Sequence, residues 1–80
     1  MKIDEKLKKH FKMLGLNIKK LREAKELTIE EMSLKTGIRK EYLKKIEIGT
    51  AYGVTLEKHL LKIARVLKTN FSELFNFEEI

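Results

Sequence analysis

The sequence contains no cysteine, no proline and no tryptophan, and glycine occurs only four times in 80 residues. Without cysteine there is no disulfide to staple a secreted domain, which fits a reducing, cytoplasmic environment. No apolar run is long enough to span a bilayer and no segment resembles a signal peptide, so we expect no membrane partner. The absence of proline removes the strongest helix breaker. A composition dominated by lysine, glutamate and leucine then predicts an all-α fold.

Charge is what the sequence has in excess. Its 18 basic and 12 acidic residues give a net charge of +6, and the surplus lies in the first third of the chain. A basic balance favours an anionic partner such as nucleic acid, although many soluble proteins of this charge bind none. Eighty residues suffice for one domain, which we expect to span residues 1–80.

One apolar stripe, with steps of three and four residues, predicts a long first helix from about Asp4 to Lys25. Gly15 lies inside this helix and costs about 1 kcal/mol relative to alanine, so a break there is possible. The stripe consists of Ile3, Leu7, Phe11, Leu14, Ile18, Leu21 and Ala24.

A capping signal opens the second helix. Thr28 and Glu31 have the spacing of a capping box, in which each side chain hydrogen-bonds to the backbone of the other residue. We expect this helix to continue to about Thr36. Gly37 then suits the left-handed position that ends a helix, because a side chain would clash there.

Three further helices follow in the pattern. The third covers about 40–48 and is closed by Gly49, and the fourth covers about 56–67. Residues 70–73, with the sequence NFSE, have the form of another capping box and begin a short fifth helix. We therefore expect a compact five-helix domain that ends in an acidic tail over 76–80.

Two short helices joined by a glycine turn form a helix-turn-helix, whose second helix enters the major groove of DNA. In the helix over 40–48, Leu43 and Ile46 share one face and the opposite face is cationic. We expect its outer residues to contact base edges: Lys40, Glu41, Lys44 and Lys45. The alternative is a solvated helix face on which Glu41 and Lys45 form an ordinary i,i+4 ion pair.

The residues that carry these signals also resemble a known family. The run LREAKELTIEEMSLKTGIRKEYLKKIEIG, followed by LLKIARVLKTNFSELF, is similar to the phage-repressor-like (Cro/C1, XRE-type) helix-turn-helix regulators of bacteria and phages. The shared features include Thr36-Gly37-Ile38, Ile46-Glu47-x-Gly49 and Lys62-Ile63-Ala64. The likeness covers 14–75, which leaves a basic, helical N-terminal extension over 1–13.

The resemblance implies a lambda-repressor-like fold and a sequence-specific double-stranded DNA-binding regulator. It would be of repressor type and a homodimer, with its recognition helix over about 39–48. It also implies an ion pair between Arg22 and Glu47 that ties the first helix to the recognition helix, and a small residue at Ser33 where two helices approach. We expect four residues to contact DNA phosphates: Thr28, Arg39, Tyr42 and Thr50. For Tyr42, packing against the second helix is the favoured alternative.

Three positions depart from the family pattern, and one of them is Arg39, which replaces the serine or threonine that commonly caps the recognition helix. Ile29 stands where glutamine usually contacts a phosphate, and Ile48 stands where asparagine is common. We expect both to pack at the rim of the core, with a surface for a protein partner as the alternative. Some bacterial cytoskeletal adaptors resemble this fold, carry apolar residues near the position of Ile29 and bind protein instead of DNA. The second candidate function is therefore a protein-interaction module on a helix-turn-helix scaffold, with little or no DNA binding.

The amphipathic segment 1–13 has three candidate roles: it covers the core, forms a dimer contact or lies on a membrane surface. Two apolar sets are rival dimer surfaces: Ile3, Leu7 and Phe11, and Phe71, Phe75, Phe77 and Ile80. His10 and His59 have no partners at the spacing of metal ligands, and the chain shows no nucleophile–base spacing and no phosphate-binding glycine loop. We expect no enzymatic activity, no metal, no cofactor and no small-molecule ligand.

Overall fold

The structure is a computed structural model, and it describes residues 4–77. Within these residues the chain forms four α-helices, one π-helix and one 3-10 helix, without a β-strand. In chain order they are α1 (Glu5–Ala24), α2 (Ile29–Thr36), α3 (Lys40–Ile48), η1 (the π-helix Leu56–Leu60), α4 (Leu61–Leu67) and η2 (the 3-10 helix Phe71–Phe75). The predicted bounds of the first three helices agree with the structure. The predicted fourth helix is η1 continued by α4, and the predicted fifth is the 3-10 helix η2.

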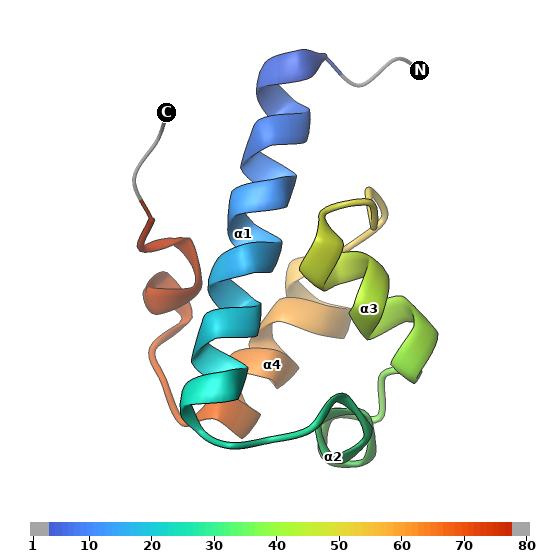
Figure 1. Ribbon diagram of the computed structural model, residues 1–80, viewed down its shortest axis with the longest axis vertical. Helices are drawn as coiled ribbons and strands as arrows, with labels where there is room; N and C mark the ends of the chain where they lie inside the picture. Colours follow the sequence, from blue (N-terminus) through green and yellow to red (C-terminus); the bar gives the residue numbers. More distant parts are fainter. Residues whose placement is uncertain (1–3, 78–80) are drawn as a thin grey trace.

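The helix α1 is the axis of the molecule and packs against α3 and η2. Figure 1 shows α1 along the long axis, with η2 on one side, α3 on the other, α4 behind and α2 below. Side chains from all of these elements build one apolar core, in which Ile18, Met32, Leu43, Ile63 and Leu67 are among the fully buried residues. The core therefore holds α2 and α3 in a fixed orientation on α1 and α4.

The helix α1 continues through Gly15 without a break. The glycine is required there because α3 packs closely against it. A Cβ atom placed on Gly15 would collide with the carbonyl oxygen of Ile46 and lie 2.6 Å from that of Glu47. Gly49, at the end of α3, has a similar constraint, since a Cβ atom there would lie 2.6 Å from the Cα of Lys12. The two helices thus touch backbone to backbone, which only glycine permits.

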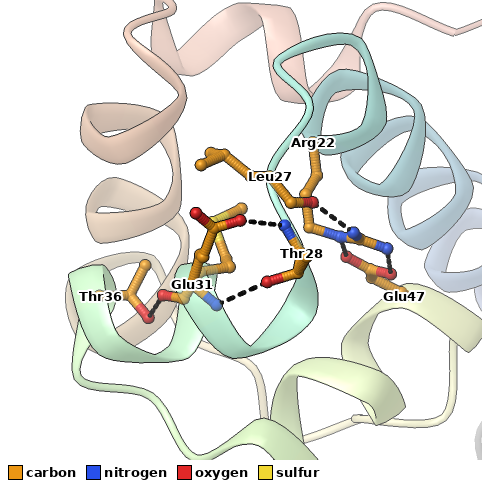
Figure 2. A network of polar contacts seen from close by, with 7 residues as sticks. Arg22, Leu27, Thr28, Glu31, Thr36 and Glu47 are labelled. Carbon is orange, nitrogen blue, oxygen red and sulfur yellow. Dashed lines mark hydrogen bonds and ion pairs between the residues drawn. The ribbon is translucent and has the colours of Figure 1, made fainter.

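Local caps set the bounds of α1 and α2. The Asp4 carboxylate accepts the backbone N–H of Leu7 at 2.8 Å and begins α1. At α2 the capping box is complete: Glu31 N donates to Thr28 Oγ1 at 3.0 Å, and Thr28 N donates to Glu31 Oε1 at 2.9 Å (Figure 2). The hydrogen bond from the Thr28 backbone N–H to the carboxylate is the main cause that lowers the pKa of Glu31. Gly37 ends α2 in the left-handed conformation, with φ 78°.

The expected capping box at the last helix is wrong. The Asn70 side chain makes no capping hydrogen bond. Instead, Asn17 of α1 donates through its amide nitrogen to the carbonyl oxygens of Glu73 and Leu74, each at 2.8 Å, while Leu74 is fully buried. The segment η2 is therefore held by a tertiary contact with α1 rather than by its own N-terminus.

Candidate nucleic-acid interface

The helices α2 and α3 are joined by a tight turn over 37–39. Beyond the left-handed Gly37, the Ser33 hydroxyl donates to the carbonyl oxygen of Ile38 at 2.6 Å and the backbone N–H of Ile38 donates to Thr36 Oγ1 at 3.1 Å. Met32 and Leu43 fill the angle between the two helices without any exposure to solvent. These contacts fix the direction in which α3 leaves the turn.

The helix α3 buries one face and exposes the other. Leu43 and Ile46 are buried in the core, whereas Glu41, Lys44 and Lys45 are exposed. Lys40 is half-buried, and its Nζ lies 3.7 Å from a carboxylate oxygen of Glu30 on α2. A partly exposed pair of this kind contributes about 1 kcal/mol or less, so a phosphate or base could replace Glu30 as the partner of Lys40.

The four predicted phosphate contacts lie at the ends of α2 and α3. Thr28 begins α2 and Arg39 precedes α3, where it provides no side-chain cap. Thr50 follows α3 and its backbone N–H donates to the carbonyl oxygen of Lys45 at 2.9 Å. Tyr42 packs its ring on His59 of η1, with centroids 4.8 Å apart, a partner that the sequence did not predict.

Arg22 and Glu47 form a forked ion pair that joins α1 to α3. Arg22 donates through Nε and Nη2 to the two carboxylate oxygens of Glu47, at 2.7 and 3.0 Å, and through Nη1 to the carbonyl oxygen of Leu27 at 2.7 Å (Figure 2). The two side chains are only 11% and 7% exposed. The hydrogen bonds with Glu47 are the main cause that raises the pKa of Arg22, so the guanidinium stays charged in the folded protein. It sets both the position of α3 on α1 and the start of the loop to α2.

Ile29 and Ile48 differ in environment. Ile29 is half-buried and packs against the core, as predicted. Ile48 is 64% exposed, so the prediction that it packs at the rim of the core is wrong. The reason is helical geometry: two residues beyond the buried Ile46, a side chain points to roughly the opposite side of the helix. An exposed isoleucine therefore lies at the end of α3.

The structure also brings together cations that the sequence did not connect. An open groove of about 290 Å³ runs between the start of α3 and the segment formed by η1 and α4. We call it the cation groove, and its lining residues are Gly37, Ile38, Arg39, Tyr42, Lys58, His59 and Lys62. The only sequence signal for it was the i,i+4 spacing of Lys58 and Lys62, which places both on one side of a helix.

His59 is neutral in this groove. Its Nδ1 accepts the backbone N–H of Thr55 at 2.9 Å, so the proton of the neutral ring lies on Nε2. Burial lowers the pKa of His59, and the charges of Lys58 and Lys62 lower it further.

The two rival dimer surfaces lie side by side. Leu7 and Phe11 of α1 face Phe75 and Phe77 across a groove of about 250 Å³. We call it the apolar groove, and its lining residues are Leu7, His10, Phe11, Leu14, Phe75 and Phe77. Phe71 packs edge-on against Phe75 with ring centroids 5.1 Å apart. Ile3 and Ile80, the remaining members of the two sets, lie outside the described residues.

Two kinds of feature are absent from the described part of the chain. Residues 4–77 contain no group of three or more histidine, aspartate or glutamate side chains that could hold a metal ion. None of their helices is both long enough and apolar enough to cross a membrane.

The geometry of α2 and α3 defines a helix-turn-helix protein: two short helices, a left-handed glycine between them and a cationic outer face on the second. The family comparison agrees, since a model of the Cro/C1-type HTH DNA-binding domain matches residues 17–79. The chain belongs to this family, which confirms the resemblance drawn from the sequence. No curated protein and no solved structure matches the chain. Membership makes DNA the expected partner.

Proposed function

We propose that this protein is a sequence-specific regulator of transcription, of repressor type, that acts in the cytoplasm as one helix-turn-helix domain. The supporting observation is the disposition of α3. Leu43 and Ile46 are buried in the core, and Glu41, Lys44 and Lys45 are left in solvent beyond the rigid turn. A helix of this width fits the major groove of B-DNA, where base edges carry the sequence information.

Each outer residue of α3 has a definite chemistry for base edges. Lys44 and Lys45 donate to guanine O6 and N7, and Glu41 accepts from the amino group of cytosine. Lys40 joins them once it leaves Glu30. Contacts from Thr28, Arg39, Tyr42 and Thr50 to phosphates would fix the register without reading the sequence.

A titration tests this function. Duplexes selected from random DNA are bound to the wild type and to the variant Lys44→Ala plus Lys45→Ala, and affinity is followed by fluorescence anisotropy at several salt concentrations. Two base contacts at about 1–3 kcal/mol each predict a loss of at least about 30-fold on the selected duplex and a smaller loss on a scrambled one. The matched control is Lys19→Ala plus Lys20→Ala, two exposed cations of α1. The proposal is wrong if no duplex is selected even at low salt, or if both double variants lose the same affinity.

The regulator would bind as a homodimer, because recognition helices of this class read half-sites about 34–36 Å apart. We assign the apolar groove to a second copy of the chain. The apolar groove is lined by residues from both of the dimer surfaces that the sequence predicted.

Sedimentation equilibrium tests the dimer. The variant Phe75→Glu places a charge in the apolar groove and should shift the protein to monomer, with weaker binding to a palindromic duplex. Leu34→Glu is the control, because Leu34 is a large apolar side chain on α2 that is already 86% exposed. Equal masses for the wild type and Phe75→Glu would exclude this interface.

One observation favours the alternative of a protein-interaction module. The exposed Ile48 offers an apolar contact at the end of α3, where asparagine is common in the family. Under this alternative, a partner captured from nuclease-treated lysate would be lost with Ile48→Asn, and no duplex would be selected. Under the proposed function, nuclease treatment removes the captured material and Ile48→Asn strengthens DNA binding.

A further inference from the structure

A third groove in the structure involves no residue of the recognition helix. It is an open hollow of about 260 Å³ where the end of α1, the helix α2 and the end of α4 meet. We call it the lysine groove, and its lining residues are Lys25, Leu27, Lys35, Val66 and Lys68. On α2, Glu30 pairs with Lys40 of α3, whereas Lys35 lies five residues later and points about 140° away around the helix. A duplex bound along the outer face of α3 therefore leaves the lysine groove open.

The lysine groove has apolar walls and cationic edges. Leu27 and Val66 are half-buried against the core and present their remaining surface to the hollow. Lys25, Lys35 and Lys68 are exposed, and within residues 4–77 none of them forms an ion pair with a carboxylate. Each of the three stands in the last turn or at the C-cap of its helix, where the helix dipole favours a cation. The packing of α1, α2 and α4 then brings these three charges around one hollow.

The backbone holds the walls of this groove in place. Glu26 and Lys68 are the two non-glycine residues with a positive φ in the described part of the chain, at 56° and 54°. Lys68 lines the groove, and Glu26 lies between two residues that line it. Left-handed conformations are unfavourable for residues with a Cβ atom, so the surrounding packing has to maintain them. Arg22 contributes by donating to the carbonyl oxygen of Leu27 at 2.7 Å. The groove is therefore preformed.

The size and chemistry of the groove indicate its occupant. It is smaller than the roughly 300–1,000 Å³ of small-molecule sites, so it suits a few side chains of a peptide. Its charges and walls call for carboxylates next to an apolar side chain. This chain contains such a segment: residues 78–80 are Glu78, Glu79 and Ile80, and they lie outside the described residues.

This segment cannot enter the lysine groove of its own copy. Phe77, the last described residue, lines the apolar groove with Phe11 in the first half of α1. The lysine groove begins at Lys25, beyond the other end of α1, where α1 and α2 meet in Figure 1. From Phe11 to Lys25 the helix rises about 21 Å, whereas three extended residues span at most about 11 Å. The occupant therefore has to come from another copy.

We propose that Glu78, Glu79 and Ile80 of one copy bind in the lysine groove of a second copy. The two carboxylates pair with lysines at the edges, and the Ile80 side chain lies between the apolar walls. Two different surfaces meet in this contact, so it continues from copy to copy as an open row unless it closes into a ring. It is separate from the dimer contact proposed for the apolar groove and would join one dimer to the next. The contact itself does not depend on the proposed function, and on DNA it would make neighbouring dimers bind cooperatively.

The first experiment measures the contact with a peptide. A peptide with the sequence of residues 76–80, NFEEI, carries a fluorophore at its N-terminus and is titrated with the wild-type protein at low salt. Anisotropy should rise to saturation. Glutamine in place of both glutamates of the peptide should weaken binding about fivefold or more, and so should Lys25→Gln plus Lys68→Gln in the protein. The control Lys19→Gln plus Lys20→Gln removes the same charge from exposed positions of α1 and should leave binding unchanged.

Three outcomes of this titration would overturn the inference. The peptide does not bind, it binds equally well with glutamine in place of glutamate, or both protein variants lose the same affinity. A peptide held by its phenylalanine in the apolar groove would also be recognised, because it would be lost with Phe75→Glu and kept with Lys25→Gln plus Lys68→Gln.

The second experiment reverses the charges on each side of the contact. The tail variant is Glu78→Lys plus Glu79→Lys, and the groove variant is Lys25→Glu plus Lys68→Glu. In sedimentation velocity the wild type should form species larger than a dimer that grow with concentration and disappear at high salt. Each variant alone should lack them, and an equimolar mixture of the two should regain them, because each tail then meets a groove of opposite charge. A mixture that behaves like its components, although both are folded by circular dichroism, contradicts the proposal. If the groove variant does not fold, the peptide titration decides.

A third arm separates this contact from the proposed function. On duplexes with two selected sites at a series of spacings, the wild type should fill the second site more tightly than the first at one or more spacings. The tail variant should lose that preference and keep its discrimination between a selected and a scrambled site. If no duplex is selected, the proposed function fails and the peptide and sedimentation results still decide this inference. If duplexes are selected but the peptide does not bind, the proposed function stands and this inference fails.

Discussion

Replacing Gly15 with alanine is expected to destabilise the protein, although alanine is the better helix former. In a free helix the change would gain about 1 kcal/mol. In the folded protein the new methyl group would collide with the carbonyl oxygen of Ile46 and lie 2.6 Å from that of Glu47. Both obstacles are backbone atoms, so no side-chain rotation can make room.

The size of the effect follows from what must move. Ordinary contact needs a separation on the order of 3.5 Å, so α3 has to shift away from α1 by about 1 Å. Overpacking of this kind costs about 1–3 kcal/mol, and backbone obstacles place it near the upper end. After the gain in helix propensity, a net loss of about 2 kcal/mol remains. For a domain of this length that is a melting temperature lower by about 8–16 °C.

Urea denaturation followed by far-UV circular dichroism measures the change. The calibration is an exposed site of the same helix, where Lys20→Ala should be more stable than Lys20→Gly by about 1 kcal/mol. Suppose that alanine at position 15 is more stable than glycine, as alanine is expected to be at position 20. Then α1 and α3 do not touch at this crossing and the reasoning is refuted. Gly15→Ala should also weaken DNA binding, because α3, the helix that must move, is the proposed recognition helix.

Three further predictions follow from the polar contacts. Arg22→Ala should lower the free energy of unfolding by about 3 kcal/mol, because it leaves the buried Glu47 carboxylate without a partner. Arg22→Met combined with Glu47→Leu should lower it far less. Urea denaturation measures both variants, and equal losses would contradict the role of the unpaired charge. Thr28→Ala should lose about 1 kcal/mol in the same assay and Thr28→Ser little, since serine keeps the capping acceptor; a loss in both would point away from the cap. As the pH falls through about 6.5, the folded state should lose stability, because the pKa of His59 is lowered by folding and the unfolded chain takes up the proton first. His59→Phe keeps the stacking surface and should flatten the dependence of melting temperature on pH in that range, and an unchanged dependence would show that His59 is not its source.

The parts of the fold that were predictable depend on contacts between near neighbours in the chain. The capping box joins residues three apart, and the left-handed glycines at 37 and 49 stand where their helices end. The periodicity of Leu43 and Ile46 predicted which face of α3 is buried, and the structure confirms it. No pattern within either helix indicates that Arg22 pairs with Glu47, a residue 25 positions away. This ion pair was expected from the family resemblance alone.

Other features could not be read from neighbouring residues. Asn70 has the form of a cap and makes none, while Asn17 holds the same segment across 56 and 57 positions of sequence. The exposure of Ile48 and the meeting of Lys58 and Lys62 with Arg39 likewise depend on where helices cross, which no local pattern encodes.

The sequence by itself determined the helices, their ends and the family, because caps, glycines and apolar periodicity act within a few residues and are strong enough to be read one segment at a time. Only the tertiary structure decided which helices pack against each other and which side chains meet where they cross. Gly15 is the clearest case: as a residue in a helix it is a weak point, and as a residue at a helix crossing it is what lets α1 and α3 touch. The physical reason is that close packing depends on atoms brought together from distant parts of the chain, and the cost or benefit of a side chain is set by those neighbours.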